Sequence, residues 1–170
     1  MSLFHATVPP LKKMLTNLDA WLDKAVEHGK ARSFDPETLL VARLAPDQYN
    51  LTRQIQSACD SAKFAAARLT GKDAPKHADT ETTLGELRAR IKSVVEYLGT
   101  YKEADFAGTE DKLLELQFLQ GKLIRGEDYL HGMQLPNFYF HLINAYAILR
   151  HNGVDLGKRD FIGGLELRDK

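Results

Sequence analysis

Asn137 and His141 form the polar pair with the clearest chemical potential in this sequence. They stand at positions i and i+4, so a helix presents both side chains on one face. The surrounding stretch, residues 137–153, is apolar on nearly every side and predicts a helix buried inside a domain. Burying polar groups is costly unless they are hydrogen-bonded. The pair is therefore either a structural hydrogen-bonding node or part of a functional site, and the sequence leaves both open.

Three further side chains near this pair could line a pocket. Tyr139 and Tyr146 could offer hydroxyl groups to a ligand, although buried tyrosines more often donate to backbone carbonyls. His131 could enter a pocket near the start of the same helix, with an exposed loop position as the alternative.

On an earlier segment, the basic residues Arg88, Arg90 and Lys92 are typical of a solvated helix face.

Composition bounds the function. The 170 residues fit a single domain spanning residues 1–170. Lysine plus arginine equals aspartate plus glutamate at 23 each, so no global field attracts nucleic acid or an anionic membrane, and neither partner is expected. No apolar run is long enough to span a bilayer, and the first residues lack a signal-peptide pattern. These features predict a cytoplasmic protein of bacterial type.

Three other segments must position the polar pair. In each, apolar residues alternate three and four positions apart, a spacing typical of helices packed almost antiparallel in a bundle. The seams are Val8, Leu11, Leu15, Leu18, Leu22 and Ala25, then Leu51, Ile55, Ala58, Ala62, Ala65 and Leu69, then Leu84, Leu87, Ile91, Val94 and Leu98. With the last helix they predict an all-α four-helix bundle.

Helix ends are marked by capping signals. Asp47 is a predicted N-cap, and Thr83 with Glu86 forms a predicted capping box. Pro9 and Pro10 leave the start of the first helix open. A glycine follows the end of each seam, where it can take the left-handed conformation that stops a helix. These glycines are Gly29, Gly71, Gly99 and Gly153.

The connections hold smaller elements. Asp35-Pro36-Glu37 predicts a short extra helix over residues 36–41. Residues 112–124, with Gly121 between two apolar runs, predict a small β-hairpin before the last helix. The charged and glycine-containing tail, residues 154–170, predicts a loop packed on the surface.

The stretch from Asn137 to His141, Asn-Phe-Tyr-Phe-His, and the ending from Ala145 to Gly153, Ala-Tyr-Ala-Ile-Leu-Arg-His-Asn-Gly, resemble an uncharacterised bacterial family. That family lies within the DinB/YfiT-like superfamily of metalloenzymes, and the resemblance extends over nearly the whole chain. It implies an up-down-down-up bundle that is commonly dimeric, so a homodimer is expected. Characterised members of the superfamily bind a divalent metal and include thiol-dependent transferases and isomerases.

The superfamily's metal site uses one histidine of the second helix and two histidines, one turn apart, on the last. By this resemblance His141 takes the final ligand position, Asn137 the earlier one, and Gln54 the position on the second helix. Residues 42–74 contain no histidine. Carboxamides are weak ligands for transition metals, so a site of this kind should hold zinc or nickel only weakly.

Two functional hypotheses follow. In the first, the chain is an uncharacterised DinB-like bundle in which Gln54, Asn137 and His141 form a hydrogen-bonded cluster in a polar pocket for a small molecule. Its metal site is then degenerate. In the second, the chain is a metal-dependent thiol transferase or isomerase with His141 as one ligand. The sequence does not decide whether the protein is an enzyme.

Overall fold

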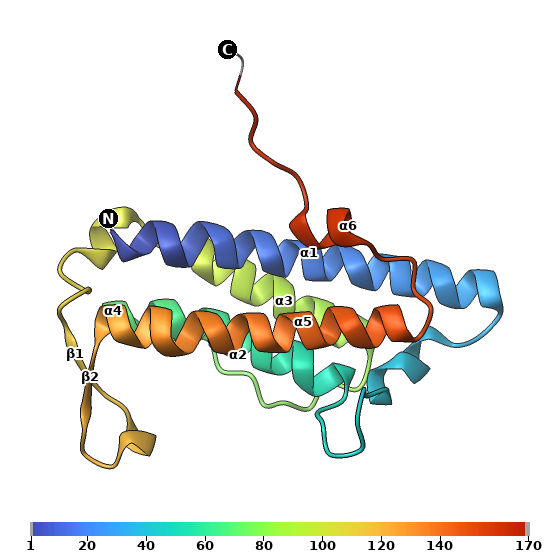
Figure 1. Ribbon diagram of the computed structural model, residues 1–170, viewed down its shortest axis with the longest axis horizontal. Helices are drawn as coiled ribbons and strands as arrows, with labels where there is room; N and C mark the ends of the chain where they lie inside the picture. The colour runs from blue at the N-terminus through green and yellow to red at the C-terminus, as the bar shows by residue number, and fades with distance from the viewer. Residues whose placement is uncertain (1, 169–170) are drawn as a thin grey trace.

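Four long helices packed side by side make up most of this computed structural model, which describes residues 2–168 (Figure 1). They are α1 (Leu3–Arg32), α2 (Leu51–Thr70), α3 (Leu84–Gly99) and α5 (Leu135–His151). In Figure 1, α1 and α5 run in one direction and α2 and α3 in the other, with the linker between α2 and α3 returning along the bundle. The predicted all-α, up-down-down-up bundle is confirmed.

The core lies where the predicted apolar seams meet. α2 packs against both α3 and α5, while α1 packs against α3 and α2. Leu18, Ile55 and Leu87, one from each of the first three seams, are completely buried. Fully burying such a side chain contributes about 1.5–3 kcal/mol, so the seams hold the helices in register.

Three predicted end signals are confirmed, and one of them is Gly153, which follows the end of α5 with a φ of +90°. The Thr83 hydroxyl accepts from the backbone N–H of Glu86 at 3.1 Å, and the Glu86 carboxylate accepts from the N–H of Thr83 at 3.1 Å. Gly71 caps α2 with a φ of +82°, and its N–H donates to the carbonyl of Ala67. All three signals involve residues close in sequence, which is why the sequence alone reveals them.

Other predicted ends were wrong. Asp47 lies in a turn, and the N-cap of α2 is Asn50, whose side chain accepts from the N–H of Arg53 at 3.0 Å. α1 does not stop at Gly29 but continues to Arg32, after which Ser33 takes the left-handed conformation. Gly99 is itself the last residue of α3 and has no positive φ. In each case another residue nearby satisfies the free backbone groups of the helix end.

Pro9 and Pro10 lie inside α1, which begins at Leu3. Each proline removes one hydrogen bond of the helix backbone. The buried side chains of Val8 and Leu11 flank them and anchor this part of the helix to the core. Tertiary packing therefore stabilises the helix where local propensity opposes it.

The short elements were largely as predicted. A 3-10 helix, Pro36–Val41, forms after Asp35. β1 (Leu113–Glu115) and β2 (Leu123–Arg125) pair antiparallel, with Leu114 opposite Ile124, in a hairpin beyond one end of the bundle (Figure 1). Gly126 follows β2, where a Cβ would lie 1.9 Å from the carbonyl oxygen of Thr109, so only glycine fits.

The segment leading into α5 is helical from Gly126. α4 (Gly126–Tyr129) continues through a π-helical turn, Leu130–Gln134, directly into α5. The last helical segment therefore begins well before Asn137. π-helical turns are rare and frequently occur at functional sites.

The tail prediction was incomplete, because residues Lys158–Ile162 form a short helix, α6. It docks on α1, where the Trp21 indole N–H donates to the carbonyl of Asp160 at 3.0 Å and the ring stacks on Phe161. Among residues 2–168, no helix is both long and apolar enough to cross a bilayer.

Candidate functional site

His141 and Gln54 form a buried hydrogen-bonded pair between α5 and α2. Nδ1 of His141 lies 2.8 Å from Oε1 of Gln54, and the Gln54 amide nitrogen donates to the carbonyl of Tyr49 at 3.3 Å. Because the amide nitrogen is used there, the amide oxygen faces the imidazole, and Nδ1 must carry the proton. Gln54 is 1% exposed and His141 8%. The pair thus fixes the tautomer that leaves the Nε2 lone pair free.

The surroundings keep this imidazole neutral. Burial lowers the pKa of His141, and the positive charge of Arg53 lowers it further. The ring lies nearly parallel to that of Tyr49, with centroids 6.3 Å apart, and edge-on to that of Phe140 at 5.3 Å. At neutral pH the side chain is therefore an oriented hydrogen-bond acceptor.

Asn137 lies at the rim of the helix interface rather than inside it. We expected it to be buried with His141, but it is exposed, and its amide nitrogen donates to the Ser61 hydroxyl at 2.6 Å. Positions i and i+4 differ by about 40° around a helix, so one can be buried while the other reaches the surface. The Gln54–His141 and Asn137–Ser61 contacts are separate.

His141 and Asn137 nevertheless line the same groove, about 250 Å³ in volume, between α2 and α5. Nε2 of His141 has no hydrogen-bond partner among residues 2–168 and is not sealed from solvent. The other lining residues are Tyr49, Arg53, Ser57, Asp60, Ser61, Phe64 and Arg68, from α2 and the segment before it, and Met133 and Gln134, from the π-helical turn.

The three other predicted lining residues lie elsewhere. Tyr146 packs edge-on against Trp21 and Phe161, at the junction of α5, α1 and α6. Tyr139 is half-buried, and burial raises the pKa of its hydroxyl. His131 is exposed within the π-helical turn. The groove contains none of them.

Gln134 is a groove residue that the sequence analysis missed. It is 3% exposed, and its amide nitrogen donates to the Tyr129 hydroxyl at 2.6 Å, while Oε1 is buried without a partner. A signal existed, because Gln134 stands seven residues before His141 and so shares its helix face. Starting the predicted helix at Asn137 hid that relation.

A second missed feature is a charged cluster beside the groove. Arg90 is 2% exposed, not solvated, and forms ion pairs with Asp60, Asp79 and Glu81. Burial opposes ionisation of Asp79, yet hydrogen bonds from Arg53 and Arg90 hold its pKa below the ordinary value. Asp60 and Arg53 both line the groove, and Arg53 donates a hydrogen bond to Asp79 in the linker between α2 and α3. This bond connects the linker to the charged wall of the groove.

The donor atoms at this site do not fit a resident transition metal. Among residues 2–168 no group of three or more histidine, cysteine, aspartate or glutamate side chains is placed to hold an ion. Oε1 of Gln54 already accepts from His141, and Asp60 is paired with Arg90 and Lys63. His141 Nε2 is then a single nitrogen ligand where zinc sites normally use three or four protein ligands.

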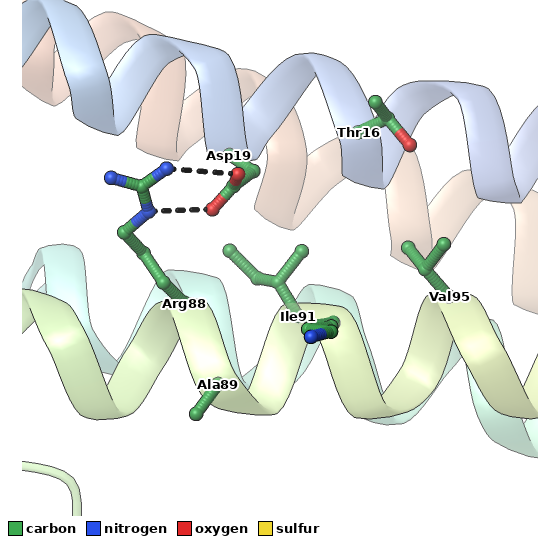
Figure 2. A pocket seen from close by; sticks show the side chains of 7 residues that line it. Thr16, Asp19, Arg88, Ala89, Ile91 and Val95 are labelled. Atoms are coloured by element: carbon green, nitrogen blue, oxygen red, sulfur yellow. Dashed lines mark hydrogen bonds and ion pairs between the residues drawn. The ribbon is translucent and has the colours of Figure 1, made fainter.

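Another hollow, about 340 Å³ in volume, lies between α1 and α3 (Figure 2). Ile91 and Val95 provide apolar side chains, and Arg88 binds Asp19 through two hydrogen bonds of 2.9 and 3.1 Å. The hydrogen bonds to Asp19 raise the pKa of Arg88, and a third contact joins it to Asp23. Asp19 and Asp23 thus already compensate the charge of Arg88. The groove between α2 and α5, which has unpaired acceptors, is therefore the better candidate site.

Comparisons with known proteins agree with this architecture. Residues 3–162 match the family model described as "Domain of unknown function (DUF1993)". A crystal structure described as a DinB family member protein from Shewanella denitrificans is similar over 99% of this chain and 96% of that one, with 47% sequence identity and a TM-score of 0.96. The comparison with curated proteins gives no match.

Proposed function

Since the chain belongs to the DUF1993 family and has a DinB-like fold, we propose that it binds a small polar molecule in the groove between α2 and α5. One observation carries the proposal: the buried Gln54–His141 pair fixes a groove-lining imidazole and leaves its Nε2 lone pair free. Grooves between helices of a bundle are common places for ligands, and a few oriented polar groups give them specificity.

Binding is the function that the geometry supports best. His141 has a lowered pKa and no carboxylate on Nδ1, since its partner there is the neutral amide of Gln54. Such an imidazole accepts a hydrogen bond well but is a weak base at neutral pH. The ligand therefore needs an O–H or N–H donor directed at Nε2.

A metal-dependent thiol transferase or isomerase is the second candidate. It is favoured by one feature, because metal-binding histidines usually donate their other ring N–H to an oxygen acceptor, as His141 does to Gln54. A zinc or nickel ion would then take Nε2 and fill its other positions with water or substrate. The lack of further strong donors ranks this candidate below the first.

Nitrogen NMR of the histidine rings tests the first proposal. We expect the His141 signals of tag-free protein at neutral pH to show a protonated Nδ1 and an unprotonated Nε2. A Gln54→Leu variant should lose this preference. A proton found on Nε2 of the native protein would remove the acceptor on which the proposal rests.

Metal analysis separates the two candidates. Tag-free native protein and the His141→Ala variant are incubated with zinc or nickel and dialysed, and the bound metal is measured. His151→Ala is the matched control, because His151 lies on the same helix with an exposed side chain. The binding proposal predicts no retained metal in any of the three. Retention of one equivalent that only His141→Ala abolishes would support the second candidate instead.

We also propose that the protein is a homodimer. The support is the family resemblance together with Phe140 and Ile143, which are 55% and 50% exposed on the outer face of α5. Sedimentation at micromolar concentration should show a dimer that a Phe140→Ser, Ile143→Ser double variant dissociates. A native protein that sediments only as a monomer would contradict this proposal.

A further inference from the structure

The α5 wall of the groove carries a row of three polar side chains. Gln134, Asn137 and His141 occupy positions i, i+3 and i+7, so they follow one face of the helix and line the same groove. Seven residues of helix span about 10 Å, which is the length of a small elongated molecule. The hydrogen bonds behind each side chain decide what this row offers.

Asn137 presents an acceptor. The Ser61 hydroxyl donates its only proton to the carbonyl of Ser57 at 2.8 Å, so it can only accept from Asn137. The 2.6 Å contact from the Asn137 amide nitrogen to that hydroxyl therefore fixes the amide orientation. Its oxygen is left without a protein donor among residues 2–168.

Gln134 presents an acceptor by the same logic. The Tyr129 hydroxyl donates to the carbonyl of Phe64 at 3.0 Å and accepts from the Gln134 amide nitrogen. The amide oxygen then remains without a partner and sealed from solvent, so a ligand donor reaches it only after a local shift of the groove wall that Gln134 lines. Leaving such an atom unsatisfied costs about 1–3 kcal/mol, which a ligand donor would recover.

His141 completes the pattern, because the contact with Gln54 uses its only ring proton. Each of the three hydrogen-bond chains ends on a backbone carbonyl, that of Tyr49, Ser57 or Phe64. These carbonyls cannot reorient unless α2, or the backbone just before Asn50, also moves. The wall thus presents three acceptor atoms, while the ring proton of His141 and one proton of each amide are already bonded within the protein.

The opposite wall supplies a positive charge. The Arg68 guanidinium lies 4.7 Å from the centre of the Phe64 ring and donates to the Tyr129 hydroxyl at 3.4 Å, but no carboxylate pairs with it among residues 2–168. The other charged lining residues are compensated, Arg53 by Asp79 and Asp60 by Arg90 and Lys63. The groove therefore has an excess positive charge at Arg68.

We propose that the ligand of this groove is a polyhydroxylated small molecule with one carboxylate or phosphate group. Its hydroxyl protons go to Gln134, Asn137 and His141, and its anionic group lies against Arg68. This inference rests on the proposed binding function and names the ligand class. An amine would meet the uncompensated charge of Arg68, whereas an anion without hydroxyl groups would leave the three acceptors unpaired.

Titrations followed by amide NMR test the ligand class with six-carbon probes. Gluconate and glucose 6-phosphate carry both features and distinguish a carboxylate from a phosphate. Glucose lacks the charge, hexanoate lacks the hydroxyl groups, and 1,6-diaminohexane is a cation. We expect at least one of the first two to shift amides of α2 and α5, with an affinity at least tenfold above the other three probes.

Variants assign the anionic end. Arg68→Gln should weaken binding at least tenfold and Arg68→Lys less, whereas Arg150→Gln, which changes an exposed arginine of α5 away from the groove, should leave it unchanged. The NMR spectrum of each free variant shows whether it is folded. Equal losses in Arg68→Gln and Arg150→Gln would refute the assignment to Arg68.

The same probes also distinguish the proposed ligand class from the binding function on which it rests. Tightest binding of glucose, hexanoate or the diamine in the groove would overturn the ligand class and leave the binding function standing. If no probe shifts groove residues, the ligand class is wrong, and the binding function is then judged by the ring-nitrogen measurement on His141.

Discussion

The contact between Gln54 and His141 gives the sharpest quantitative prediction. Replacing His141 with phenylalanine keeps a ring of similar shape but leaves Oε1 of Gln54, a residue 1% exposed, without a donor. Replacing Gln54 with leucine leaves Nδ1 of His141 unpaired. Each single change should destabilise the protein by about 1–3 kcal/mol, the usual cost of one unsatisfied buried polar group.

The double variant should be less destabilised than the sum of the singles. Removing both partners leaves an apolar pair of similar shape, which can be nearly neutral compared with leaving one partner unpaired. Part of the Gln54→Leu cost persists, because the carbonyl of Tyr49 loses its donor in either background. We expect a coupling energy of about 1–2 kcal/mol in favour of the native pair.

Urea unfolding of the four proteins measures this coupling. With a slope of about 2 kcal/mol per molar urea, a single variant that loses 2 kcal/mol shifts the midpoint by about 1 M. The slopes must agree between variants for the comparison to hold. Additive effects within about 0.5 kcal/mol would show that the two side chains do not interact, and the fixed tautomer of His141 would be refuted with them.

Four further perturbations test the fold and the charged cluster. Leu87→Ala should lower the free energy of unfolding by about 2–5 kcal/mol, since the side chain is completely buried. Thr83→Ala should lower it by about 0.5–2 kcal/mol through loss of the capping box; no change would show that the cap is dispensable. Arg90→Met should cost about 3–5 kcal/mol, because it leaves three carboxylates without their shared cation, and a neutral result would contradict the buried network. Burial, then the charge of Lys63, lowers the pKa of His77. The unfolded chain therefore binds a proton that the folded protein does not, so the free energy of unfolding falls as the pH drops below about 6.5. In urea midpoints taken from neutral pH to about pH 5, His77→Gln should reduce this dependence of stability on pH.

The helical framework could be read from the chain because its signals are local. The seam residues repeat every three or four positions, and the capping box joins Thr83 to a residue three positions later. Such patterns depend on helix geometry alone. The hairpin before α4 was marked by Gly121 in the same way.

Local signals failed where several residues could serve the same purpose. Asp47 and Asn50 are both good capping residues, and only the path of the preceding segment, with the N–H of Leu51 bonded to the carbonyl of Ala42, selects Asn50. Similarly, α1 passes through Pro9 because its neighbours are buried against other helices. Packing between elements decided these cases.

In the candidate site, too, the sequence predicts some features and packing alone decides others. The types of Gln54, Asn137 and His141 already exclude a strong three-histidine metal site, and their helix positions direct them toward the space between α2 and α5. How far each side chain enters that space depends on the rotation of α5 against α2. That rotation buries His141 against Gln54 and leaves Asn137 at the rim.

Sequence by itself thus determined the helices, their order and the polar residues available between them, because periodicity and capping act within a few residues. Tertiary structure alone decided which polar atoms are paired and which remain free. Gln134 and Arg90 acquire their roles from Tyr129, Phe64 and distant carboxylates, and no spacing along the chain encodes such contacts. Hydrogen bonds and ion pairs depend on distances that exist only after the helices have packed.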